Sequence, residues 1–388
     1  MQTGLDTILS SAVDNGDVPG VVAMVVDPDG VLYEGAFGER SLGSGAEMTL
    51  DTVGAIFSMT KPITGAAAMQ LVERGQLDLD APAGEVCEQL ADLQVLEGFS
   101  GDGEPILRPA NAPVTLRNLL THTSGFAYDI WNADMARYLD ATGTPAPTSG
   151  QRAALDVPLM FDPGSQWEYG IGIDWVGQMI EQVSGMSLGE YFAENLTGPL
   201  GMTDTAFAPT ESMTTRAATV HARLPDGRLA PLDLTKPESP EFEPGGGGLH
   251  STMIDYSRFI RMILNEGELD GSRVLAPQTV ALMAQNHMGE LRVRPLPTQV
   301  AAYSRDAEFF PGSPKSWGLS FQVNEEQTFT GRSPGTLMWA GLANSYFWID
   351  PTNGIGGCYL SQIFPFVDPH TLGTFLAFET GVYASHQG

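Results

Sequence analysis

A serine and a lysine three residues apart form the pattern with the most chemical content in this sequence. Ser58 and Lys61 lie in the segment 57–62, which reads Phe-Ser-Met-Thr-Lys-Pro. On a helix, a spacing of three puts both side chains on one face, within hydrogen-bonding reach. A serine hydroxyl needs an adjacent base to act as a nucleophile. A lysine amine can be that base if burial and the positive end of a helix dipole lower its pKa.

The flanking residues predict where this pair lies. Residues 53–57 are strand-like, and residues 63–74 are apolar on nearly every face of a helix that ends at Gly75. Pro62 suits the first turn of that helix, because its missing N–H loses no hydrogen bond there. A bare serine–lysine pair is also compatible with a capping serine and a solvated lysine. The strand-to-helix junction and the scarcity of lysine, of which the chain has three, favour the catalytic interpretation.

Two further segments can complete a site. Tyr169 follows a Pro-Gly turn and precedes a helix, and a phenol can relay protons if nearby cations lower its pKa. Ala340 and Gly341, in a strand near the C-terminus, would allow a substrate close to the backbone. The backbone N–H groups of Leu342 and Ser58 would then form the two-donor oxyanion hole that acyl transfer needs. Taken alone, each pattern is more typical of a structural role: a core tyrosine for the first and a bulged strand for the second.

Other catalytic patterns fit this sequence poorly. Residues 185–189 match the G-x-S-x-G nucleophile elbow, but helical periodicity at residues 175–183 replaces the strand that the elbow requires. Ser187 is better explained as a helix cap paired with Glu190. The six histidines form no HExxH motif, and no lysine follows the glycines at 245–248, which we expect to form a close-packed turn. The sequence therefore predicts neither a metal nor another cofactor.

The remaining sequence predicts strands at both chain ends and helices between them. A helix at 5–13 precedes a hairpin of residues 21–26 and 31–37, and a second antiparallel pair at 338–350 and 356–364 precedes a helical tail at 369–382. Further helices are expected at 115–120, 174–183, 187–196, 252–264 and 277–285.

The expected fold class is α/β. An antiparallel sheet built from both chain ends is flanked by helices, and a mostly helical domain is inserted between its halves. The predicted boundaries are 1–85 and 245–388 for the discontinuous α/β domain and 86–244 for the helical domain.

Composition limits the partners of the chain. Nineteen basic against 47 acidic residues give a net charge of −28, which repels nucleic acids and anionic membranes. No apolar run approaches the ~18 residues of a membrane span, and the first residues lack a basic start followed by an apolar stretch. We therefore expect a soluble, cytoplasmic protein whose partner is a small molecule. Cys87 and Cys358 form no CxxC motif and are expected to be free buried thiols.

In combination, the serine–lysine pair, the loop tyrosine and the strand glycine resemble the serine β-lactamase and penicillin-binding-protein superfamily. Within it the chain resembles the class C β-lactamase-like carboxylesterases, or family VIII esterases. The segments 119–125, 199–202 and 246–252 are also common in that family, and the resemblance covers about residues 5–380. It implies a β-lactamase/transpeptidase-like fold. It also implies Ser58 as nucleophile, Lys61 and Tyr169 as the base system, and the N–H groups of Ser58 and Leu342 as the oxyanion hole.

Two departures from the family pattern bear on the substrate. The third motif, which begins with Lys or His followed by Thr or Ser in β-lactamases and transpeptidases, reads Trp339-Ala340-Gly341 here, and Ile171 replaces the Asn of the Tyr-x-Asn motif. The groups that hold a substrate carboxylate and a side-chain carbonyl are therefore missing. Together with the net charge, these losses count against penicillins, cephalosporins and D-alanyl peptides. Trp339 is expected to form an aromatic wall, and with Ala340, Gly341 and Tyr128 to bind substrate.

The expected activity is therefore that of a serine carboxylesterase. It would hydrolyse uncharged short-chain acyl esters through an acyl-enzyme on Ser58, with Lys61 and Tyr169 as general base. Three alternatives remain open: a β-lactamase or D-amino-acid peptidase with a modified third motif, an acyltransferase, and a catalytically silent binding protein on the same scaffold.

Overall fold

A seven-stranded antiparallel sheet joins the two ends of the chain. The computed structural model describes residues 2–234 and 240–386. The strand order is β11-β12-β13-β14-β15-β1-β2, so the N-terminal hairpin pairs with the C-terminal strands through β1 and β15. The strands are β1 (Gly20–Val26), β2 (Val31–Gly38), β11 (Lys315–Trp317), β12 (Gln322–Asn324), β13 (Leu337–Gly341), β14 (Ser345–Asp350) and β15 (Ile355–Leu360). This arrangement confirms the predicted α/β class and the origin of the sheet.

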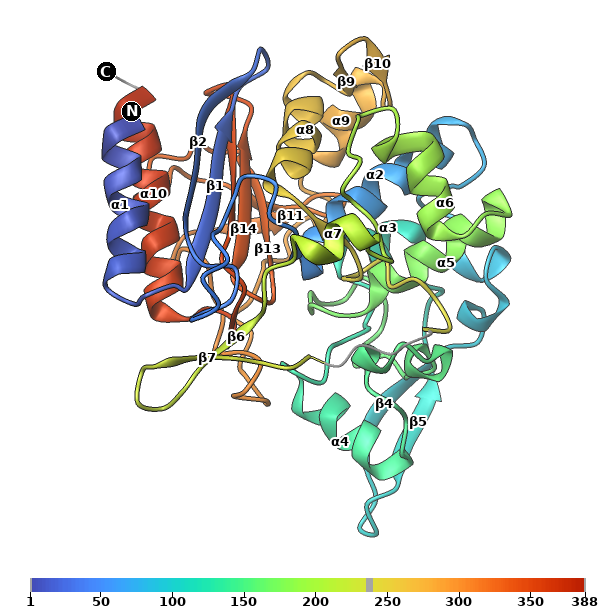
Figure 1. The fold of residues 1–388 in the computed structure, drawn as a ribbon. Coiled ribbons are helices and arrows are strands. Elements are labelled where there is room, and N and C mark those ends of the chain that lie inside the picture. Colours follow the sequence, from blue (N-terminus) through green and yellow to red (C-terminus); the bar gives the residue numbers. More distant parts are fainter. Residues whose placement is uncertain (1, 235–239, 387–388) are drawn as a thin grey trace.

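Helices cover both faces of this sheet (Figure 1). Helices α1 (Gln2–Asp14) and α10 (Pro369–His386) pack together on one face, and α8 (Met253–Leu264) packs on β1 and β15 from the other. Every residue of β1 is buried. Burial on two faces explains why this strand is a continuous apolar run instead of an alternating pattern.

The buried helix α2 (Thr60–Glu73) lies between the sheet and the other helices (Figure 1). Every residue from Thr60 to Leu71 is buried, as its all-round apolar sequence predicts. It packs against α5 (Gly172–Ser184), which also contacts α3 (Leu116–Thr121) and α6 (Leu188–Phe192). Helix α2 thereby fixes the residues at its N-terminus relative to both halves of the molecule.

Local capping determines where several helices begin. Thr115 and Ser187 each form a capping box at the start of α3 and α6, and the Thr252 side chain accepts the Asp255 N–H at the start of α8. The prediction that Ser187 caps a helix with Glu190 is confirmed. A π-helical turn (Ala193–Thr197) follows α6 within the predicted helix at 187–196.

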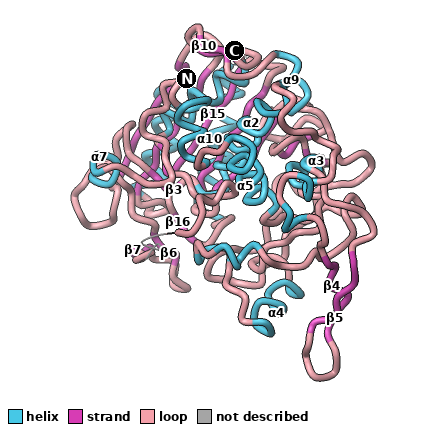
Figure 2. Tube along the Cα trace, turned by 90° about the vertical axis from the view of Figure 1, so that its right-hand side faces the viewer, coloured by secondary structure: helices cyan, strands magenta, loops and turns pink. Residues whose placement is uncertain are grey.

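The shorter elements surround this framework. In Figure 2, the β4–β5 hairpin and α4 extend from one end of the molecule. The remaining helices are α4 (Ala133–Thr142), α7 (Glu211–Thr215) and α9 (Pro277–Met283), and the 3₁₀ turns are η1 (Phe57–Met59), η2 (Ala83–Glu85), η3 (Glu88–Leu90), η4 (Pro147–Ser149) and η5 (Arg152–Leu155). The remaining strands are β3 (Gly54–Ala55), β4 (Gln94–Phe99), β5 (Pro105–Pro109), β6 (His221–Arg223), β7 (Leu229–Pro231), β8 (His250–Ser251), β9 (Glu268–Leu269), β10 (Ser272–Arg273) and β16 (Ile363–Phe364).

Three predicted strands are shorter than expected. The segment 356–364 forms β15 and then β16, which belongs to another sheet, and Gln362 between them has a φ of 57°. The segment 338–350 is not one strand but parts of β13 and β14, joined by a turn in which Asn344 has a φ of 58°. Asparagine tolerates this left-handed conformation better than most residues, so Asn344 allows a turn where the sequence has neither glycine nor proline. The segment 53–57 forms only the two residues of β3 before η1 begins. The nucleophile candidate Ser58 therefore lies in a 3₁₀ turn directly before α2.

Cys87 and Cys358 are both buried free thiols, as predicted. Within residues 2–234 and 240–386, no helix has the length and apolar character needed to cross a membrane. The division of the chain into two domains at the boundaries given above stays a prediction.

Candidate active site

The Lys61 amine lies at the centre of a buried polar cluster. Its Nζ is 3.2 Å from Ser58 Oγ, 3.0 Å from the Tyr128 hydroxyl and 2.7 Å from the Gly246 carbonyl oxygen. The Lys61 side chain is fully buried, whereas Ser58 is half-buried. Ser58 and Lys61 therefore lie within hydrogen-bonding distance, as predicted. The serine hydroxyl is partly accessible, whereas the lysine amine is shielded from solvent.

The environment of Lys61 favours its neutral form. Burial lowers the pKa of Lys61 to about 7, and the Asp174 carboxylate opposes this shift. No carboxylate among the described residues forms an ion pair with this amine; its acceptors are two hydroxyl groups and a carbonyl. The neutral amine that a general base requires is thus accessible near neutral pH.

The glycine run before α8 contributes directly to this cluster. The carbonyl of Gly246 accepts from Lys61, and its N–H donates to Asp174 Oδ1 at 2.8 Å. A Cβ on Gly246 would lie 2.8 Å from a carboxylate oxygen of Asp174, so a side chain does not fit there. The expected close-packed turn is confirmed. The sequence does not predict that the Gly246 carbonyl accepts a hydrogen bond from Lys61, because the glycines indicate only a turn.

Tyr169 is held beside Ser58 and Lys61 as a protonated phenol. Its hydroxyl accepts from Trp339 Nε1 at 2.9 Å, and Lys61 Nζ lies 4.7 Å from its ring centroid. Burial raises the pKa of Tyr169 above its ordinary value, although hydrogen bonds to Ser58 and Trp339 oppose the increase. The condition under which the sequence favoured proton relay, a pKa lowered by nearby cations, is not met, because desolvation of the phenolate raises this pKa.

Trp339 lies in the aromatic cluster behind Tyr169. Its side chain is only 3% exposed, and its ring centroid lies 4.8 Å from that of Tyr169 and 4.7 Å from that of Trp317. Trp339 is thus a buried hydrogen-bond donor to Tyr169, and its role as an aromatic wall of the substrate pocket stays a prediction. Tyr128 contacts Lys61 directly, and its expected contact with substrate stays a prediction.

His122 is a site neighbour that the sequence patterns did not single out. It lies in the segment 119–125, and its ring packs 4.8 Å from the Tyr169 ring. Its Nδ1 accepts the Gly170 N–H at 3.4 Å. Burial lowers the pKa of His122 well below its ordinary value, so it remains neutral beside Lys61. The only sequence signal was its place in a segment common to the family.

Strand β13 brings its last residues against the turn that carries Ser58. A Cβ on Gly341 would lie 2.3 Å from the Ile56 carbonyl oxygen, so only glycine permits this approach of the two backbones. Ala340 and Gly341 are buried, and Leu342 is half-buried like Ser58. The oxyanion hole formed by the N–H groups of Ser58 and Leu342 remains a prediction. It requires this close approach of the two backbones.

The other candidate nucleophile, Ser187, is an exposed residue that caps α6.

The fold and this cluster together define an acyl-transferring or hydrolysing serine enzyme of the β-lactamase type. The family model described as Beta-lactamase matches residues 5–381. The chain is 31% identical to monacolin J acid methylbutanoyltransferase from Aspergillus terreus over 99% of its length and 96% of that protein's length. It is 32% identical to lovastatin esterase from Penicillium rubens over 91% of both chains.

A solved structure agrees with these relatives. The unliganded simvastatin synthase from Aspergillus terreus superposes with a TM-score of 0.86 at 30% identity, covering 99% of this chain and 98% of that one. The chain belongs to the beta-lactamase family and is a serine hydrolase of that fold.

Proposed function

We propose that this protein hydrolyses uncharged, short-chain carboxylic esters through an acyl-enzyme on Ser58. The observation that carries the proposal is the fully buried Lys61 amine, whose pKa is lowered to about 7, at 3.2 Å from Ser58 Oγ. A neutral amine at this distance activates a serine for nucleophilic attack.

The first half-reaction follows from the positions of three side chains. Lys61 takes the Ser58 proton as Oγ attacks the ester carbonyl, and the N–H groups of Ser58 and Leu342 stabilise the tetrahedral oxyanion. Tyr169, which stays protonated because burial raises its pKa, donates its proton to the departing alkoxide. It regains a proton from the Lys61 ammonium, so that the pair returns to its starting state. Water then repeats the sequence on the acyl-enzyme.

The residues around the nucleophile favour a neutral reacting centre. Trp339 and Ile171 stand where other family members carry charged or amide groups that bind polar substrate functions, and both are buried. Among the described residues, the only cationic side chain hydrogen-bonded to Ser58 is Lys61, and the reaction needs the neutral form of Lys61. Neutral esters avoid this conflict.

A second candidate function is acyl transfer to an alcohol. The named relatives include a methylbutanoyltransferase and an esterase at similar identity, so the same scaffold serves both reactions. Hydrolysis and transfer share the acyl-enzyme and differ only in whether water or an alcohol attacks it.

Paired serine variants test the nucleophile. We expect Ser58→Ala to lower kcat for p-nitrophenyl butyrate by at least about 1000-fold, because the acyl-enzyme cannot form. Ser187→Ala, which alters the other candidate serine, should leave kcat within about twofold, since it only caps α6. Loss of activity in Ser187→Ala with retention in Ser58→Ala would overturn the assignment.

Product partitioning separates the two reactions. With an added short-chain alcohol, the ratio of new ester to free acid measures capture of the acyl-enzyme by alcohol relative to water. Predominance of acid identifies an esterase, and predominance of ester at modest alcohol concentration identifies a transferase. Turnover of the β-lactam nitrocefin at a comparable rate would instead favour the β-lactamase alternative.

A further inference from the structure

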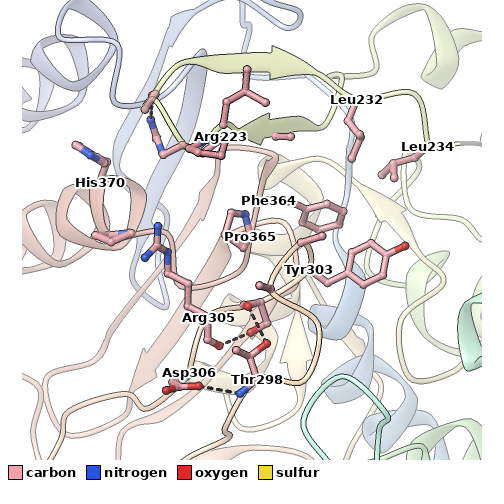
Figure 3. Close-up of a pocket in the computed structure, with 18 of the residues that line it drawn as sticks. Arg223, Leu232, Leu234, Thr298, Tyr303, Arg305, Asp306, Phe364, Pro365 and His370 are labelled. Atoms are coloured by element: carbon pink, nitrogen blue, oxygen red, sulfur yellow. Dashed lines mark hydrogen bonds between the residues drawn. The ribbon is translucent and has the colours of Figure 1, made fainter. Parts of the chain in front are cut away.

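The structure contains an open cavity of about 1040 Å³ outside the Lys61 cluster (Figure 3). The β6–β7 hairpin, the segment 298–306 and the residues around Phe364-Pro365 form its walls. None of the Ser58, Lys61 and Tyr169 side chains lines it, so it is a separate space.

The two ends of this cavity differ in chemistry. Leu232, Leu234, Tyr303 and Phe364 line one end, whereas Arg223, Arg305 and His370 lie toward the other (Figure 3). Such a site suits a ligand with an apolar body and an anionic end. A wholly apolar or wholly charged ligand would use only half of it.

Arg305 is the cation that remains available to a ligand. Arg223 is paired with Asp368 at 2.6 Å, and His370 with Asp17 at 2.6 Å. Arg305 is exposed, and its guanidinium forms no hydrogen bond, ion pair or ring contact with the described residues. Every other arginine in the described part of the chain has at least one such contact. In a chain with 47 acidic and 19 basic residues, intramolecular partners for a guanidinium are abundant, so an unpaired one facing a cavity is a notable feature.

The carboxylates of this cavity do not neutralise Arg305. Asp306 Oδ1 accepts the Thr298 N–H at 2.8 Å, and Figure 3 shows it directed away from the Arg305 guanidinium. Asp233 lies on the segment after β7 that carries the apolar residues Leu232 and Leu234. In the part of the chain that the structure describes, no carboxylate pairs with Arg305, so the guanidinium is available to a ligand anion.

The apolar end adjoins the nucleophile. The ring of Phe57, the residue before Ser58, lies 5.8 Å from that of Phe364, and the Tyr303 ring lies 5.8 Å from Phe364 on the cavity side. Phe57 and Leu342 pack on the same apolar cluster as Leu232 and Leu234. A chain extending from an ester at Ser58 past Phe57 would thus enter the cavity at its apolar end.

We propose that this cavity binds the part of the substrate remote from the ester: an apolar chain or ring that ends in a carboxylate paired with Arg305. A guanidinium holds a carboxylate through two parallel hydrogen bonds, which gives orientation as well as affinity. The placement next to an ester rests on the proposed function, whereas binding of the apolar acid does not. This inference restricts the uncharged character proposed above to the reacting ester and its surroundings, because the remote end of the substrate is then anionic.

A binding measurement tests the cavity without requiring turnover. In the Ser58→Ala background, we would titrate a dansyl-labelled undecanoic acid and its neutral amide and follow dansyl fluorescence. The acid should bind more tightly than the amide, and Arg305→Ala should reduce this acid-to-amide preference by about fivefold or more. Arg273→Ala, an exposed arginine on β10, makes the same change in net charge and should leave the preference unchanged.

A second variant locates the apolar part of the ligand. Tyr303 is exposed, so Tyr303→Ala should fold normally and weaken acid and amide alike, by about threefold. The proposal is overturned if the acid binds no better than the amide, if Arg305→Ala and Arg273→Ala behave alike, or if Tyr303→Ala has no effect on either probe. If Ser58→Ala retains full esterase activity, the proposed function fails while these binding results still decide the cavity.

Discussion

At the scale of single residues, the chemistry depends on the protonation of Lys61. Burial lowers the pKa of this amine, and the Asp174 carboxylate, which raises it, is connected to Lys61 through the backbone of Gly246. A closer carboxylate would hold the amine as an ammonium, which cannot accept a proton from Ser58. The separation of Asp174 from Lys61 is therefore as important as the burial.

The pH dependence of activity should report this protonation. The kcat/KM for a neutral ester should rise with pH through about 7, where the Lys61 ammonium loses its proton. Asp174→Asn removes the charge that raises the Lys61 pKa, so the midpoint should move to lower pH by up to about one unit. The asparagine oxygen can still accept the Gly246 N–H, which preserves the local fold.

The control for this shift is Asp255→Asn, which changes another buried carboxylate. Asp255 bonds to Thr205 and the Asp204 N–H, away from Lys61. Its variant should keep the wild-type midpoint. A midpoint that stays in place or moves to higher pH in Asp174→Asn would contradict the assigned coupling.

The hydrogen bond from Trp339 to Tyr169 is a second residue-scale test. Trp339→Phe keeps an aromatic ring but removes the donor to the Tyr169 hydroxyl, so we expect kcat to fall about tenfold with little change in KM. Trp317→Phe is the matched control, because Trp317 packs beside Trp339 and its buried indole nitrogen has no hydrogen-bond partner within the described residues. Equal losses in both variants would show that packing, not the hydrogen bond, is responsible.

At the scale of elements, the site depends on how closely β13 approaches η1. The backbone at Gly341 lies against the Ile56 carbonyl with no room for a Cβ. Phe57, between Ile56 and Ser58, has a φ of 43°, in the left-handed region that residues other than glycine seldom adopt. Tertiary packing maintains both features, because neither is favourable for an isolated segment.

Enlarging Gly341 should separate these two elements. In Gly341→Ala the added methyl group must push β13 away from η1, which would displace the Leu342 N–H from the oxyanion. We expect kcat to fall by about 100-fold and the free energy of unfolding by roughly 1–3 kcal/mol. Ester kinetics and urea denaturation measure the two effects.

The control is a glycine with free space in a helix. Gly373 lies in α10, and a Cβ added to it would have no heavy atom within 4 Å beyond its own helical turn. Gly373→Ala should leave kcat unchanged and raise stability by up to about 1 kcal/mol, because alanine favours the helix. An active, stable Gly341→Ala enzyme would show that this close approach is not required.

The cap of α6 gives an element-scale prediction for stability alone. The Ser187 hydroxyl accepts the Glu190 N–H, and the Glu190 carboxylate accepts the Ser187 N–H. Ser187→Ala should lower the free energy of unfolding by about 1 kcal/mol. Ser187→Asn, which keeps a capping oxygen, should lose much less, and an equal loss would argue against the cap.

At the scale of the whole molecule, excess negative charge opposes folding. The net charge of −28 arises from 47 acidic and 19 basic residues, so many carboxylates have no basic partner. Raising the salt concentration shortens the screening length from roughly 30 Å at 0.01 M to about 3 Å at 1 M. Because repulsive pairs outnumber attractive ones, screening should favour the compact state.

We therefore expect the apparent Tm to rise as potassium chloride is raised from low to molar concentration. Chloride is preferable to sulfate, which would also strengthen apolar burial. The Arg332–Glu379 ion pair is fully buried and should be insensitive to this screening. A Tm that falls with salt would mean that the surface ion pairs contribute more than the repulsion.

The sequence alone determined the local features of this protein. Ser58 and Lys61 lie within reach of each other because helical geometry fixes the position of residues three apart, although a 3₁₀ turn and not α2 itself carries the serine. Thr115, Ser187 and Thr252 cap their helices through bonds spanning three residues. The apolar runs of β1 and α2 predicted burial for the same local reason.

Only the tertiary structure decided what surrounds the reactive pair. The acceptor at Gly246 is 185 residues from Lys61, and the Trp339 donor is 170 residues from Tyr169. The turn at Asn344 and the cavity around Arg305 likewise depend on contacts between distant segments. Burial raises the pKa of Tyr169, whereas the proton relay considered from the sequence required nearby cations to lower it. Spacing along the chain fixes positions only within a few residues, whereas desolvation depends on every segment that folding brings near a group.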